Sequence, residues 1–95
     1  MTHTAFILHE EETPKALLVK LTQREWDVML RLAKGLTTAQ IAEEIYVEPK
    51  SVENYRTRIA AKLGLKGRNR LTWYSWKNRE ILEQHYAFYK MNHNT

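Results

Sequence analysis

The chain has 95 residues, 43% of them hydrophobic, and no cysteine, which fits one small domain with a single core and excludes disulfides, thiolate metal sites and catalytic thiols. Its four histidines lie toward the two ends of the chain rather than at metal-ligand spacing, and no apolar run approaches the roughly 20 residues of a membrane span. The formal charge of +4 points toward an anionic partner. From the histidines and the apolar runs we also expect a cytoplasmic protein without a metal or other cofactor.

The first 20 residues contain two short apolar runs, residues 5–8 and 16–19, separated by an acidic stretch that ends at Pro14. This pattern fits either a β-hairpin or an irregular arm, and both remain open. Because an isolated two-stranded hairpin is marginal in water, the segment has to rest on the helices or on a partner chain. We therefore expect an N-terminal arm at residues 1–20 and a helical domain at residues 21–92.

A first helix is predicted to begin after Thr22, because Thr22 and Glu25 have the spacing of a capping box. Apolar residues at three- and four-residue spacing over residues 26–33 give this helix a core-facing side. Gly35 follows as the residue that takes the left-handed conformation after a helix end. We interpret Arg24 and Glu25 first as a structural pair and second as a phosphate contact.

Two further helices joined by a tight turn are predicted within residues 37–63, with Thr37 or Thr38 capping one and Pro49 beginning the other. The second helix has one apolar face, made of Val52, Tyr55, Ile59 and Leu63. Its opposite face carries short polar and basic side chains: Lys50, Glu53, Asn54, Thr57, Arg58 and Ala61. Such a face suits the base edges and phosphates of DNA, although a merely solvated face fits the helical pattern equally well.

The charge is distributed unevenly along the chain. Residues 1–48 contain five basic and eight acidic side chains, a net charge of −3, whereas residues 49–95 contain ten basic and three acidic ones, a net charge of +7. The positive field therefore lies on the second of these helices and on everything that follows it, including the glycine-punctuated loop at residues 64–69.

A long fourth helix is predicted from Arg70 to about Met91 with Asn69 as its N-cap, since neither Gly nor Pro interrupts the segment. Its core face is expected to carry Leu71, Tyr74, Ile81, Leu82 and Tyr89. The helix has more aromatic surface than a small domain can bury, and either the arm or a second subunit should cover the excess. We favour a homodimer, with an interface made of Trp73, Trp76, Tyr86 and Tyr89, next to Phe88.

Several motifs occur in one order: Leu21-Thr22-x-Arg24-Glu25, Gly35-Leu36, Ile41-Ala42-Glu43, Ser51-Val52-x-Asn54, Ile59, Lys62-Leu63-Gly64 and Arg68. In this series the chain resembles the LuxR-type helix-turn-helix domain, the DNA-binding end of many bacterial quorum-sensing and response regulators, without a gap over about residues 21–82. The resemblance implies an all-α fold of four helices. Its third helix lies in the major groove, and its fourth commonly pairs two subunits.

Carried over by position, the resemblance implies base reading by Glu53, Asn54 and Thr57. It also implies phosphate contacts, or orientation of the recognition helix, by Thr38, Lys50, Ser51, Tyr55, Arg58, Lys62 and Arg68. The family usually has His at the position of Tyr55 and Ser at that of Glu48. Because Glu48 is a poor N-cap and adds negative charge, we expect weaker phosphate anchoring at the start of this helix.

The receiver and acyl-homoserine-lactone domains of such regulators do not fit in the first 20 residues, so we expect a stand-alone regulator rather than an excised domain. The leading hypothesis is a sequence-specific transcription regulator that binds double-stranded DNA as a homodimer. The alternative is a protein-interaction module that pairs with another regulator and binds DNA weakly alone. An enzyme is not expected, because no nucleophile–base set or metal cluster appears on a predicted face.

Overall fold

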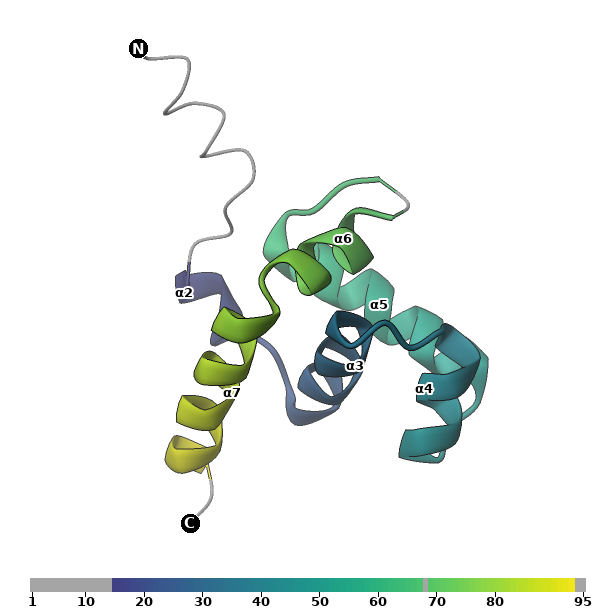
Figure 1. Ribbon diagram of the computed structural model, residues 1–95, viewed down its shortest axis with the longest axis horizontal. Helices are drawn as coiled ribbons and strands as arrows, with labels where there is room; N and C mark the ends of the chain where they lie inside the picture. The colour runs from purple at the N-terminus through teal and green to yellow at the C-terminus, as the bar shows by residue number, and fades with distance from the viewer. Residues whose placement is uncertain (1–14, 68, 94–95) are drawn as a thin grey trace.

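The computed structural model describes residues 15–67 and 69–93, and these residues form six α-helices and no strand. The helices in Figure 1 are α2 (Lys15–Leu18), α3 (Gln23–Ala33), α4 (Thr38–Ile45), α5 (Pro49–Leu63), α6 (Arg70–Lys77) and α7 (Arg79–His93). The all-α class predicted from the sequence is therefore confirmed.

The second apolar run of the expected arm is helical, not a strand. Residues 16–18 belong to the single turn of α2, and Leu18 and Leu21 are buried in the core. Ala, Leu and Lys all favour a helix, and one turn is enough to lay Leu18 against the other helices. The hairpin is thus wrong for this run, and the first run, residues 5–8, lies outside the described residues.

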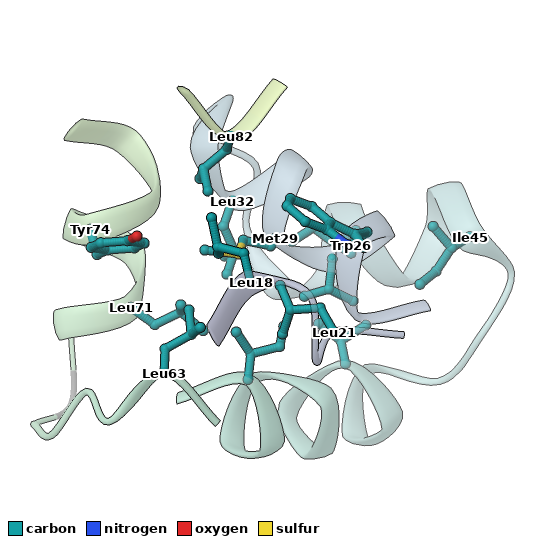
Figure 2. Packing of buried hydrophobic residues seen from close by; sticks show 14 of the residues in the cluster. Leu18, Leu21, Trp26, Met29, Leu32, Ile45, Leu63, Leu71, Tyr74 and Leu82 are labelled. Atoms are coloured by element: carbon teal, nitrogen blue, oxygen red, sulfur yellow. The ribbon is translucent and has the colours of Figure 1, made fainter. Parts of the chain in front are cut away.

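Helix α3 is central, with α4, α5, α6 and α7 all packed against it (Figure 1). The predicted capping box at its start is confirmed. The Thr22 hydroxyl accepts the Glu25 N–H at 3.2 Å, and the Glu25 carboxylate accepts the Thr22 N–H at 2.9 Å. Figure 2 shows the core around this helix, where its side chains meet residues from every other helix: Leu18, Ile45, Leu63, Leu71, Tyr74 and Leu82.

The predicted long fourth helix is broken at Asn78 into α6 and α7. The Asn78 side-chain amide donates to the Tyr74 carbonyl at 2.9 Å, and the Asn78 carbonyl accepts the Leu82 N–H at 2.9 Å. A short polar side chain that bonds to nearby backbone can end a helix without Gly or Pro. Beyond the break Leu82 is completely buried, whereas Ile81, predicted on the core face, is 45% exposed.

Candidate nucleic-acid interface

Helices α4 and α5 are joined by a tight turn at residues 46–48. Thr37 caps α4 in a second capping box, with Gln40 as the reciprocal partner. Tyr46 ends α4 in the left-handed conformation, with φ of 60°, although only glycine adopts this conformation without strain. This turn redirects the chain so that Pro49 begins α5, as predicted.

Helix α5 is fixed to the body of the molecule by one face and exposes the other. Val52, Ile59 and Leu63 are buried in the core, in contact with α3 and α4. The opposite side chains predicted to face DNA are all exposed: Lys50, Glu53, Asn54, Thr57, Arg58 and Ala61. The structure therefore brings the three predicted base-reading residues together with Ala61 on one surface, which we call the α5 arc: Glu53, Asn54, Thr57 and Ala61.

Tyr55 and Arg58 lie on one flank of this arc. Tyr55 is half-buried and packs against the core, and the Arg58 guanidinium lies 5.7 Å from the centre of its ring. Ser51, in the first turn of α5, is half-buried. Glu48 makes no side-chain capping bond, as its poor capping propensity predicts.

The ammonium of Lys62 makes hydrogen bonds to acceptors within the protein. Its ammonium donates to the Glu25 carboxylate at 2.6 Å and to the Lys20 carbonyl at 3.0 Å. The Glu25 side chain is only 3% exposed, so Lys62 supplies the charge that a buried carboxylate needs. The expected Arg24–Glu25 pair is wrong, because Arg24 pairs with Asp27 at 3.5 Å.

A groove of about 610 Å³ runs along the other flank of the arc, beside the start of α4 and the loop that leads into α6. It is lined by Thr38, Glu53, Arg56, Thr57, Ala60, Ala61, Leu65, Gly67, Asn69 and Leu71. Sequence reasoning singled out Thr38 but missed Arg56, whose guanidinium reaches Thr38 and Thr72. The helical wheel places Arg56 between the core face and the arc, and this border position is the signal that could have identified it. Arg68 lies outside the described residues.

The four aromatic residues predicted at a dimer interface fall into two groups. Tyr86 and Tyr89 pack on Trp26 of α3, with ring centroids 5.6 and 6.1 Å away. Trp73 and Trp76 on α6 are 43% and 54% exposed. Each of these indoles is covered on one face by a cation, from Lys77 at 4.7 Å and Arg79 at 4.9 Å respectively.

Within the described part of the chain, acidic residues and histidines form no cluster of three or more that could hold a metal ion. None of the helices described has the length and apolar character needed to cross a membrane.

Comparison with protein families shows which kind of helix-turn-helix this is. The family described as "Bacterial regulatory proteins, luxR family" matches residues 19–75, which include α3, α4, α5 and most of α6. The chain belongs to this family. The resemblance found in the sequence is thus confirmed, and the LuxR-family domain is the DNA-binding part of a transcription regulator. Helix α7 lies beyond the matched residues.

The LuxR-family domain of this chain is also similar to the oxygen regulatory protein NreC of Staphylococcus aureus, in strains JH9, JH1 and Mu3 among others. Each is 40% identical over 63 residues, which cover 66% of this chain and 29% of the relative. The similarity is therefore to less than a third of those regulators. No solved structure gives a significant match.

Proposed function

We propose that this LuxR-family chain is a sequence-specific transcription regulator that inserts α5 into the major groove of double-stranded DNA. The observation that carries the proposal is the division of α5 into a buried apolar face and an exposed polar arc. The buried face fixes the helix, while Glu53, Asn54 and Thr57 present hydrogen-bonding groups of the kinds that recognise base edges.

The phosphate contacts are proposed on both flanks of the arc. Lys50 and Arg58 supply exposed cations, while Ser51 and Tyr55 offer hydroxyl groups that donate to phosphate oxygens. Thr38 lies across the groove at the start of α4, and the basic loop contributes Arg68. Lys62 is best assigned to support of the fold, because two of its three donors are already used.

The test is DNA binding by the purified full chain. Selection from random duplex DNA, followed by affinity measurements on selected and random sequences at several salt concentrations, should give one preferred motif and a linear fall of log K with log salt. Equal affinity for all duplexes would contradict sequence-specific recognition. Absence of salt-dependent binding would contradict the DNA-binding proposal itself.

We also propose that the regulator acts as a homodimer through α6. Trp73 and Trp76 leave large aromatic surfaces exposed on this helix, and aromatic residues are enriched at the centres of protein interfaces. A symmetric pair would place two α5 helices about 34 Å apart, one turn of DNA, on an inverted-repeat site.

A second candidate function rests on the same exposed indoles. The α6 surface is also suited to pairing with a different regulator, and the chain alone would then bind DNA weakly. Tight, salt-dependent binding to a selected site by the purified protein separates the two candidates, because only an independent DNA-binding regulator shows it.

A further inference from the structure

Arg56 is held in one position by hydroxyl groups from two other helices. Its guanidinium donates to the Thr38 hydroxyl of α4 at 3.3 Å and to the Thr72 hydroxyl of α6 at 3.0 Å. Both bonds are partly buried and join residues 18 and 16 positions apart in the chain. The guanidinium is thus fixed at the groove beside the α5 arc rather than free to move in solvent.

This cation has no negative partner among residues 15–67 and 69–93, where the three ion pairs use Arg24, Arg31 and Lys62. Both of its acceptors are neutral hydroxyls. Glu53 is the one carboxylate on the groove lining, and it makes no ion pair with Arg56. A partly buried charge usually has a counter-charge, so a guanidinium held in this way is suited to an anion from outside.

Hydrogen-bond donors and helix ends around Arg56 strengthen the preference of this site for an anion. Since the Thr38 hydroxyl accepts a hydrogen bond from Arg56, its own hydrogen remains available as a donor toward the groove. Thr38 is the first residue of α4 and Thr72 the third of α6, so two positive helix ends also lie at the guanidinium. Asn69 lies on the same groove and uses its side chain in no capping bond.

We infer that Arg56, together with Thr38, binds one backbone phosphate of the DNA whose bases face the α5 arc, and that Thr72 positions the guanidinium. The inference rests on the proposed function and adds a contact to it. A DNA phosphate is favoured over a free anion because Thr57 and Ala61 of the arc line the same groove. A strand in the groove would therefore hold its phosphate against Arg56 while its bases meet the arc, which fixes the register of α5.

The experiment uses the full chain, a selected duplex and a random duplex. Arg56→Gln removes the charge and keeps a hydrogen-bond donor, and Arg56→Lys restores the charge. We expect Arg56→Gln to flatten the dependence of log K on log salt by about one unit on both duplexes, and Arg56→Lys to recover the slope. Thermal unfolding of each variant is measured in parallel, because a merely structural tie would lower the melting temperature and leave the slope unchanged.

Neutral methylphosphonates placed one at a time along the duplex locate the contact. In the wild type, a methylphosphonate at one position in each half-site should weaken binding. In Arg56→Gln the same methylphosphonate should have no effect. If Arg56→Gln fails to fold, Thr38→Val is used in its place. The methylphosphonate at the same position should then weaken binding by Thr38→Val less than it weakens binding by the wild type. The inference would be overturned if the variants left the slope of log K against log salt unchanged and if no methylphosphonate position had a different effect in the variants than in the wild type.

Two further outcomes separate this inference from related ones. If inorganic phosphate at low millimolar concentration competes with DNA in the wild type but not in Arg56→Gln, the groove is a site for the free anion and the DNA-phosphate assignment is wrong. If the wild type shows no salt-dependent DNA binding, the proposed function fails, and this inference fails with it. If the wild type binds DNA and Arg56→Gln binds it with the same affinity and salt dependence, only this inference is contradicted.

Discussion

Asn54 tests base recognition at the scale of a single residue. Its amide is exposed on the α5 arc and matches the N6 and N7 edge of adenine. We expect Asn54→Ala to relax the preference at one base pair in each half-site by about 1–3 kcal/mol, with little change in binding to random DNA. Affinities for the selected site and its single-base variants provide the measurement.

A matched control for this experiment is Gln84→Ala, since Gln84 is also exposed but lies on α7, outside the arc. This variant should bind both kinds of DNA as the wild type does. If Asn54→Ala instead loses affinity equally on specific and random duplexes, Asn54 positions the helix and does not recognise a base.

Lys62 gives a second residue-scale prediction, now on stability. Lys62→Ala leaves the buried Glu25 carboxylate with the Thr22 N–H but without its cation. We expect a loss of about 1–3 kcal/mol in the free energy of unfolding, the usual cost of a buried polar group that loses a partner. Chemical denaturation of Lys62→Ala measures this loss.

The control for Lys62 is Lys66→Ala, because Lys66 is a nearby exposed lysine on the loop. Its effect on stability should stay within about 0.5 kcal/mol. Equal stability of the two variants, combined with a flatter salt dependence only in Lys62→Ala, would return Lys62 to the phosphate contacts.

The break between α6 and α7 makes a prediction at the scale of the element. Leu82 is completely buried, whereas its chain neighbour Ile81 is 45% exposed. We expect Leu82→Ala to cost about 2–5 kcal/mol of stability, the range for truncating a buried leucine. Ile81→Ala should cost much less. Similar losses in both variants would contradict the packing of α7 that buries Leu82 and exposes Ile81.

The homodimer is a prediction about the whole molecule. Trp76 is 54% exposed on α6, and a charge at an apolar interface centre cannot be desolvated cheaply. We expect sedimentation to show a wild-type dimer that dissociates in Trp76→Glu, while the helical circular dichroism is retained. A wild-type monomer at tens of micromolar that binds half-sites as tightly as the full repeat would rule out the dimer.

Phe88→Glu serves as the control for this experiment. Phe88 is exposed like Trp76 but lies on α7, beside α2 rather than on the proposed α6 surface. The proposed interface predicts that this variant remains a dimer. Dissociation in Phe88→Glu, with a dimer retained in Trp76→Glu, would move the interface to α7.

The sequence by itself determined the start and end of α3 and of α5 and the two faces of α5, but neither α2 nor the break between α6 and α7. The capping box at Thr22, the start at Pro49 and the glycines after α3 and α5 all act within a few residues, so local pattern is enough to place them, whereas it left both Thr37 and Thr38 open as the cap of α4. The amphipathic period likewise separated the buried face of α5 from the exposed one.

Only the tertiary structure decided which distant side chains meet. Lys62 and Glu25 are 37 residues apart, and the Arg56 contacts join three helices, so no local spacing predicts either. The same holds for the packing of Tyr86, which was expected to be excess aromatic surface, and of Tyr89, which was expected both on the core face and at the interface, against Trp26 of α3. These contacts depend on how the helices pack, because side chains that meet across helices have no fixed separation in sequence.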